Sequence, residues 1–211
     1  MKLAVLGATG GTGQQLLRQA LDLGHEVTAV VRDASRLPAD LRGRLDVAQT
    51  DVMDPGAIAS AVKGRDAVLS AMGARGRGPT TVQSGSIAAV IKAMTQTQAR
   101  RVLMVSAGGL VAGADDGLFT QYVLKPLVQR MLRHSYADLA EAERLLRATD
   151  LDWTIVRPSR LTDGGRSARY RTALDRNIRG GLSTTRADLA HCMLNLITDQ
   201  SSIHRVVSVA S

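Results

Sequence analysis

The stretch GATGGTG, residues 7–13, lies between the apolar run KLAVL (residues 2–6) and the segment QQLLRQALDL (residues 14–23). In the second segment apolar residues recur on one face of a helix, and Gly24 stands where a helix-terminating glycine is common. The chain therefore passes from a strand through a glycine-rich turn into a helix. Whether this unit is repeated along the chain decides the fold class.

The alternation of strand and helix continues to the end of the chain. The predicted strands are residues 2–6, 26–32, 45–52, 66–73, 101–107, 152–158 and 204–210. The predicted helices are residues 14–23, 55–64, 81–98, 136–149 and 185–198. Asp54, before Pro55, and a capping box from Thr185 to Asp188 mark two of the helix starts. Strands that are apolar on both faces and alternate with helices form parallel sheets covered on both sides. We therefore expect an α/β fold, a single Rossmann-type domain over residues 1–211, with a doubly wound parallel sheet of six or seven strands and helices on both faces.

Composition excludes several classes of protein. No apolar run reaches the ~20 residues that a membrane-spanning helix needs. Glycine and threonine interrupt the N-terminal apolar stretch after Leu6, which argues against a secretory signal. The lone cysteine, Cys192, excludes an internal disulfide and a cysteine metal cluster. We expect a cytoplasmic protein with no metal site and no membrane partner.

The net charge of +8 arises from 27 basic and 19 acidic residues. Such an excess can mark binding of nucleic acid, of an acidic lipid surface or of anionic small molecules. No run of five basic residues occurs, and aromatic residues, which stack on single-stranded bases, make up only 2% of the chain. We therefore expect no nucleic-acid partner and read the excess as arginines spread over the surface.

The glycines of the opening stretch suit a dinucleotide. Glycines at a strand-to-helix turn let the backbone approach a pyrophosphate closely, while the helix N-terminus offers unpaired N–H groups and the positive end of its dipole. The spacing is G-x-x-G-x-x-G, and two threonine hydroxyls add donors to the turn. The predicted phosphate loop comprises Gly7, Thr9, Gly10, Gly11, Thr12 and Gly13.

The end of the second predicted strand indicates which dinucleotide binds. An NAD site has a carboxylate there, about 20 residues past the glycines, to bind the ribose hydroxyls. This chain has Arg32, with Ser35 and Arg36 close behind, and arginine suits a 2′-phosphate through charge-assisted hydrogen bonds. Asp33 could in principle reach a ribose instead. The pattern favours NADPH.

Five stretches together resemble a known family. They are GATGGTG (7–13), VVRDASRLP (30–38), TDV (50–52), MGARGRGPTTV (72–82) and LDWTIVRP (151–158). They resemble the atypical, NmrA-like short-chain dehydrogenases that include biliverdin-IXβ reductase/flavin reductase, closely in the N-terminal half and more loosely after Gly108. The resemblance implies an NADPH-dependent reductase of flavins or related planar acceptors.

The resemblance also implies roles for individual residues. It assigns Arg32 and Arg36 to the 2′-phosphate, Asp51 and Val52 to the adenine, Met72, Gly73 and Arg75 to the cofactor cleft, and Ser106 and Pro158 to the nicotinamide. Where those reductases have histidines near the substrate, this chain has Leu139 and Arg160, which argues against biliverdin-type substrates.

The ordinary acid of short-chain dehydrogenases is absent from the sequence. Those enzymes pair a tyrosine with a lysine four residues later, which lowers the tyrosine pKa. Here the three tyrosines are followed at that spacing by Pro126, Ala140 and Leu174. Reduction of a flavin needs no such acid, because the charge spreads over the ring and solvent can supply the proton.

Ser106, at the end of the fifth predicted strand, is the candidate catalytic residue. Its hydroxyl could bind the nicotinamide amide or the substrate, or it could bond the local backbone.

Arginines follow the fourth and sixth predicted strands, where an acceptor would enter. They are Arg75, Arg77, Arg160, Arg166, Arg169 and Arg171. We expect them to favour an anionic acceptor such as FMN, and a quinone is the other small-molecule acceptor considered. The alternative function is a redox sensor that binds NADP(H) without turnover. A sugar-nucleotide epimerase is disfavoured because it too uses the tyrosine. Nothing in the sequence indicates an oligomeric state.

Overall fold

The computed structural model describes residues 1–74, 76, 78–108 and 133–211. Strand β1 (Lys2–Leu6), buried beyond its first residue, leads through the glycine turn into α1 (Gly11–Asp22). Gly10 is the N-cap residue, so α1 begins three residues earlier than its apolar face indicates. The last three residues of the predicted turn are therefore the first turn of the helix.

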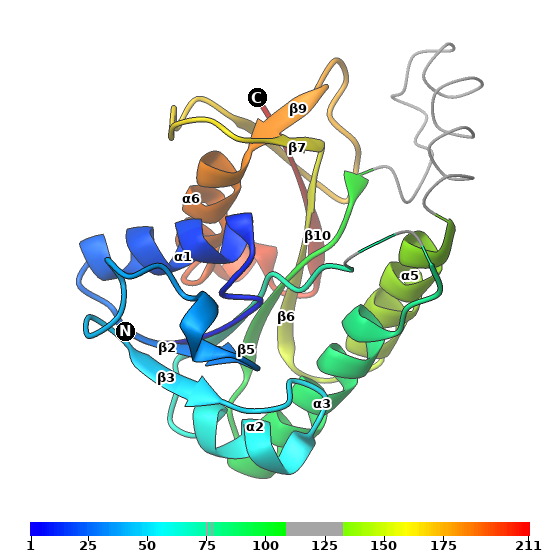
Figure 1. Ribbon diagram of the computed structural model, residues 1–211. Helices are drawn as coiled ribbons and strands as arrows, with labels where there is room; N and C mark the ends of the chain where they lie inside the picture. The colour runs from blue at the N-terminus through cyan, green and yellow to red at the C-terminus, as the bar shows by residue number, and fades with distance from the viewer. Residues whose placement is uncertain (75, 77, 109–132) are drawn as a thin grey trace.

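The predicted strands and helices occur in the predicted order, and three short strands, β7, β8 and β9, lie between the last two predicted strands (Figure 1). The strands are β2 (Glu26–Val31), β3 (Asp46–Gln49), β4 (Ala67–Ser70), β5 (Arg101–Val105), β6 (Asp152–Pro158), β7 (Arg160–Thr162), β8 (Arg171–Leu174), β9 (Ser183–Thr185) and β10 (Arg205–Ala210). The helices are α2 (Pro55–Val62), α3 (Val82–Thr97), α5 (Arg133–Arg147) and α6 (Arg186–Leu196), with short 3-10 turns η1 (Ala34–Arg36) and η4 (Gln200–Ser202).

The main sheet has the strand order β3-β2-β1-β4-β5-β6-β10-β8. All of its neighbours pair in parallel except β8, which is antiparallel to β10. This confirms the doubly wound α/β fold but corrects the strand number, since eight strands replace the predicted six or seven. The strand added to this sheet, β8, lies at its edge with mostly exposed residues, so it carries no apolar pattern for the sequence to reveal, and the other two unpredicted strands, β7 and β9, form a separate two-stranded sheet.

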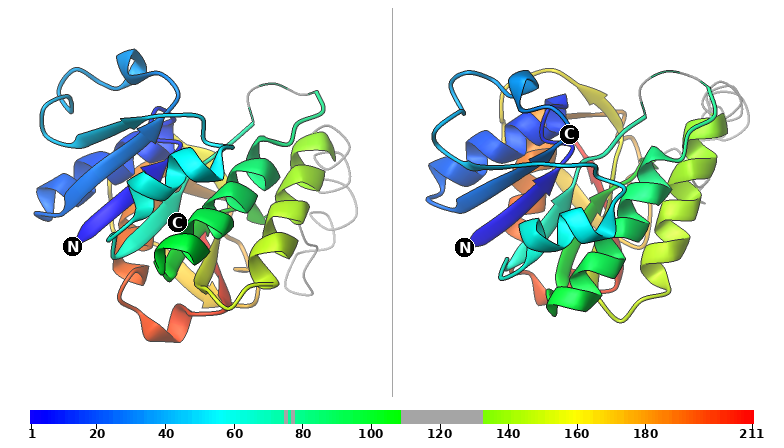
Figure 2. Two further views of the ribbon diagram at one scale, coloured as in Figure 1. Left: turned by 90° about the horizontal axis from the view of Figure 1, so that it is seen from below. Right: turned by 60° about the horizontal axis from the view of Figure 1, so that its bottom comes forward.

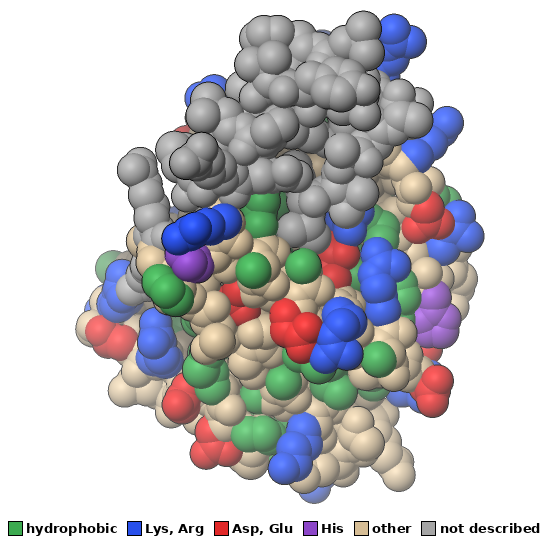
Figure 3. Space-filling view, turned by 90° about the vertical axis from the view of Figure 1, so that its right-hand side faces the viewer, with side chains coloured by type: hydrophobic (Ala, Val, Ile, Leu, Met, Phe, Trp, Pro, Cys, Tyr) green, Lys and Arg blue, Asp and Glu red, His purple; other side chains and the backbone are tan. Residues whose placement is uncertain are grey.

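Helices cover both faces of the sheet, as predicted. On one face α1 and α6 pack against a core that includes Leu16, Leu17 and Leu189. On the other face α2, α3 and α5 lie side by side over a core that includes Ile58, Ile87 and Leu146 (Figure 2). The outer surface over α3 and α5 carries basic and acidic side chains interspersed with one another (Figure 3).

The predicted N-caps of α2 and α6 are both present, but the cap of α6 differs from the predicted capping box. Asp54 accepts hydrogen bonds from the N–H groups of Gly56 and Ala57, and Thr185 accepts one from Asp188. The Asp188 carboxylate does not complete the predicted capping box. It is fully buried and accepts hydrogen bonds from Ser167 and Ala168, which fastens the segment before β8 to α6.

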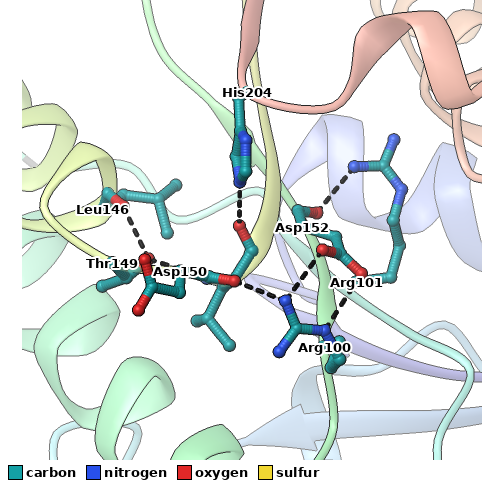
Figure 4. A network of polar contacts seen from close by, with 8 residues as sticks. Arg100, Arg101, Leu146, Thr149, Asp150, Asp152 and His204 are labelled. Carbon is teal, nitrogen blue, oxygen red and sulfur yellow. Dashed lines mark hydrogen bonds and ion pairs between the residues drawn. The ribbon is translucent and has the colours of Figure 1, made fainter.

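A buried arginine joins the elements at the amino ends of the strands (Figure 4). Arg101 donates to the carbonyl oxygens of Leu196 and Ile197 at the end of α6, and to the Asp152 carbonyl on β6. Burial lowers its pKa to about 10. Beside it, Arg100 forms an ion pair of 3.1 Å with the Asp152 carboxylate. This end of the sheet is thus filled by structural contacts, and the opposite, carboxyl edge holds the candidate site.

None of the helices in the described part of the chain is long and apolar enough to cross a bilayer.

Candidate functional site

The glycine turn is a place where backbone segments approach closely. Gly7 has a φ of +74°, and a Cβ on it would lie 2.4 Å from the carbonyl oxygen of Ala71. A Cβ on Gly13 would lie 2.1 Å from the carbonyl oxygen of Gly7. The glycines therefore allow β1, β4 and α1 to meet. Because the N-cap residue Gly10 has no side chain, it cannot accept hydrogen bonds from the first N–H groups of α1, which suits an anion.

A cavity of about 970 Å³ runs from this turn along the carboxyl ends of β1, β2, β4, β5 and β6. Most of the predicted site residues line it, namely Gly7, Thr9, Gly10, Gly11, Thr12, Arg32, Arg36, Val52, Met72, Gly73, Ser106 and Pro158. These residues lie at or after the carboxyl ends of six strands, β1 to β6.

The remaining predicted residues lie elsewhere. Gly13 packs beneath the turn rather than along the cavity. Ser35 donates its hydroxyl to Asp33, and Asp51 accepts a hydrogen bond from the N–H of Met53, and neither lines the cavity. Arg75 and the neighbouring Arg77 fall outside the described residues.

Asp33, the carboxylate at the end of β2 that could otherwise bind a ribose, is hydrogen-bonded within its own turn. Asp33 caps η1, accepting hydrogen bonds from the hydroxyl (2.6 Å) and the N–H (2.9 Å) of Ser35, which lower its pKa. Arg42 holds this turn by donating to the carbonyl oxygens of Ser35 and Leu37. Arg32 and Arg36 are exposed at the rim, so two cations face this end of the cavity.

The Ser106 hydroxyl belongs to a buried network. It donates to the carboxylate of Glu143 at 2.6 Å, and Arg157 donates to both oxygens of the same carboxylate at 2.9 and 2.6 Å. Burial by itself raises the pKa of Glu143, but the hydrogen bonds from Arg157 and Ser106 outweigh it and the pKa is lowered. Because an ionised carboxylate only accepts hydrogen bonds, the Ser106 proton is committed to Glu143. Toward a ligand, Ser106 is left as an acceptor.

Sequence reasoning missed Glu143 and Arg157, although one signal was present. Glu143 lies on the buried face of α5 with Leu139 and Leu146, and a glutamate in an apolar stripe requires a partner. The partners could not be identified from the sequence because Ser106 follows β5 and Arg157 lies on β6, whereas Glu143 lies on a helix.

Arg186 was missed as well. It is the first residue of α6, lines the cavity, and packs so closely on the first turn of α1 that a Cβ on Gly11 would lie 2.6 Å from its Cδ. Asp163 fixes its guanidinium through an ion pair of 2.6 Å. A cation therefore stands beside the uncapped N–H groups of α1.

The side of the cavity formed by the first turn of α3, by α5 and by the segments from β6 to β9 is here called the distal side. It is lined by Gln83, Ser135, Tyr136, Leu139, Arg157, Arg160 and Leu182. Burial raises the pKa of Tyr136, so its hydroxyl is protonated at neutral pH. Among the arginines expected at the acceptor entrance, Arg160 lies here. Arg166 and Arg169 are exposed outside this lining, and Arg171 lines a smaller hollow of about 240 Å³ with Arg176 and Arg179.

Comparisons with known proteins agree with this geometry. Residues 7–200 match the NAD(P)H-binding family. The uncharacterised protein YwnB of Bacillus subtilis is 30% identical over 204 residues, covering 92% of this chain and 91% of YwnB. A short-chain dehydrogenase/reductase from Veillonella parvula, solved in complex with NADP, has a TM-score of 0.84 at 19% identity, covering 100% of this chain and 94% of its own.

A third similar structure is ChuY, an anaerobilin reductase from Escherichia coli O157:H7, with a TM-score of 0.78 at 23% identity, covering 100% of this chain and 97% of its own. At these identities the solved structures establish the fold alone. The family match spans most of the chain and includes the glycine turn, the ends of β2, β4, β5 and β6, and α6. The chain therefore belongs to the NAD(P)H-binding family and has the Rossmann-type fold of the short-chain dehydrogenase/reductase-like oxidoreductases.

Proposed function

We propose that the protein is an NADPH-dependent reductase that transfers hydride to a flavin or a similar planar acceptor. The observation that carries the proposal is a single cavity that joins the glycine turn and two exposed arginines to a distal side with both polar and apolar walls. Such a cavity can hold a dinucleotide at one end and a second ring system at the other.

The residues present fit a dinucleotide. Close backbone packing at Gly7 and Gly13 forms the tight turn between β1 and α1, and the first N–H groups of α1 have no side-chain cap from Gly10. Thr12, in the first turn, and Arg186, beside it, would add a hydroxyl donor and a positive charge for the pyrophosphate.

The rim at the end of β2 supports NADPH over NADH. Asp33 is the only carboxylate in the described lining, and it already caps η1 through Ser35. Arg32 and Arg36 are exposed beside it and would bind a 2′-phosphate through charge-assisted hydrogen bonds.

The chain's own residues would position the reacting rings rather than transfer protons. When bound, the reduced nicotinamide supplies a hydride. Ser106, whose proton is held by Glu143, would accept a hydrogen bond from an amide N–H and so fix the ring orientation. The described lining includes Tyr136 but no lysine to lower its pKa. A flavin suits this arrangement because solvent can protonate the reduced ring.

The acceptor is proposed to be anionic. Arg160 lines the distal side and is exposed, and no described carboxylate forms an ion pair with it, so its charge is available to a phosphate such as that of FMN. If Arg160→Glu together with Arg169→Glu leaves the KM for FMN unchanged, this part of the proposal is wrong. A quinone would respond to neither substitution.

The reductase proposal is tested by measuring oxidation of NADPH, and of NADH in parallel, with FMN, riboflavin or menadione as acceptor. We expect acceptor-dependent oxidation of NADPH and much slower oxidation of NADH. Tight binding of NADPH without turnover on any acceptor would instead favour a sensor that binds NADP(H), the alternative that the sequence leaves open.

A further inference from the structure

Gln83, in the first turn of α3, has a buried amide with one unused polar atom. The residue is 5% exposed and lines the distal side of the cavity. Its Nε2 lies 3.4 Å from the Ser135 hydroxyl, while Oε1 has no hydrogen-bond partner among the described residues. In this orientation the unpaired atom is an acceptor, and an acceptor calls for a ligand that offers an N–H. Buried polar atoms in native proteins are nearly always paired, which points to a ligand at this place.

The position of Gln83 is fixed by α5. Asp138, 5% exposed, accepts hydrogen bonds from the N–H groups of Gln83 and Ser84, both at 2.9 Å, and from the Ser84 hydroxyl at 2.5 Å. Asp138 therefore caps α3, which Thr81 does not do with its side chain. Since a carboxylate already occupies this helix N-terminus, an anionic ligand is disfavoured here. The group left to bind a ligand is the neutral amide of Gln83.

We propose that Gln83 selects the acceptor by pairing with an imide edge, the C(=O)–NH–C(=O) group of a planar ring. A flavin presents this edge as O2, N3–H and O4, so the unpaired Oε1 can accept a hydrogen bond from N3–H. A quinone offers carbonyl oxygens but no N–H. This inference rests on the proposed reductase function and names the chemical feature by which that site recognises its substrate.

The experiment compares riboflavin with N3-methylriboflavin, which lacks the imide N–H, and with menadione, which has no imide. The full chain is assayed as wild type and as Gln83→Leu. In wild type we expect N3-methylation to lower kcat/KM on the order of tenfold, the effect of leaving a buried polar atom unpaired. In Gln83→Leu the two flavins should become equal, and menadione should be unaffected by the substitution.

Gln19→Leu is the matched control. Gln19 is also buried and has an unpaired Oε1, but it donates to the Ala187 carbonyl between α1 and α6, away from the cavity. The control should keep the discrimination between the two flavins. Because Gln83 has one unpaired amide atom and only a long contact of 3.4 Å to Ser135, Gln83→Leu should not lower the melting temperature, whereas a purely structural role would lower it.

The inference is overturned if Gln83→Leu still discriminates between the two flavins, or if wild type reduces menadione but neither flavin. If NADPH is not oxidised with any acceptor, the reductase proposal fails by itself. The affinities of riboflavin and N3-methylriboflavin for wild type and for Gln83→Leu are then measured by fluorescence quenching in the presence of NADP⁺. The ratio of the two affinities in each protein decides the role of Gln83. Binding of neither flavin would overturn both.

Discussion

Replacing Glu143 by glutamine tests the buried network behind Ser106. The substitution keeps the shape of the side chain but puts an NH₂ where one carboxylate oxygen accepts from Ser106 or Arg157. It also leaves the Arg157 guanidinium, with a side chain 12% exposed, without its counter-ion. Breaking a buried pair from one side costs about 3–5 kcal/mol. For a chain of 211 residues a loss of about 3 kcal/mol lowers the melting temperature by about 6–12 °C.

The matched control is Glu141→Gln on the exposed face of the same helix, where Glu141 pairs with Arg144 at 2.7 Å. That variant should have the same melting temperature as wild type, because an exposed ion pair contributes little to the free energy of unfolding. Thermal unfolding followed by circular dichroism measures both variants. If Glu143→Gln melts within 2 °C of Glu141→Gln (roughly 1 kcal/mol or less), the reasoning about the network is refuted.

The pH dependence of this difference has a definite sign. The pKa of Glu143 is lower in the folded chain than in the unfolded chain. Its contribution to stability is therefore fully present above the unfolded pKa, about 4.3, and is lost as the pH falls through the folded value below it. The gap in melting temperature between wild type and Glu143→Gln should be constant near neutrality and should narrow in acid.

Three further predictions concern the cavity. The double substitution Arg32→Ser and Arg36→Ser should lower kcat/KM for NADPH by about 10- to 100-fold, because the 2′-phosphate loses its charged donors. The kcat/KM for NADH, which has no 2′-phosphate, should stay nearly unchanged. An equal loss with NADPH and NADH would contradict this prediction. Tyr136→Phe should keep flavin reduction within about threefold of wild type, since no acid is needed, whereas a general acid would contribute about 10²- to 10⁴-fold. Gly13→Ala should abolish NADPH binding measured by calorimetry, because its Cβ would lie 2.1 Å from the Gly7 carbonyl oxygen, whereas Gly10→Ala, at 3.3 Å, should retain measurable binding.

The parts of the fold that could be predicted from the sequence are those governed by local pattern. Strands such as β1 and β6 are apolar on both faces, and the glycine turn between β1 and α1 has an unmistakable spacing. Strand β8 could not be predicted, because an exposed edge strand is held by backbone hydrogen bonds to β10 that leave no apolar pattern.

In the candidate site, too, some residues could be predicted from local pattern and others could not. Residues at strand ends, such as Arg32 and Ser106, could be assigned because parallel strands bring their carboxyl ends to one edge. The contacts that define what Ser106 can do come from Glu143, 37 residues away, and the cation beside Gly11 comes from Arg186. Contacts of this kind depend on how the helices pack across the sheet, and the packing cannot be predicted from the pattern of neighbouring residues in the sequence.

The most direct test of the central claim is an anaerobic single turnover of the NADPH-loaded wild-type protein mixed with one equivalent of FMN. Loss of the nicotinamide absorbance and bleaching of the flavin are followed together. The account predicts that both signals change with one rate constant and in equal amounts, and that NADH loaded under the same conditions reacts much more slowly. An NADPH complex that forms but leaves FMN, riboflavin and menadione oxidised would contradict it.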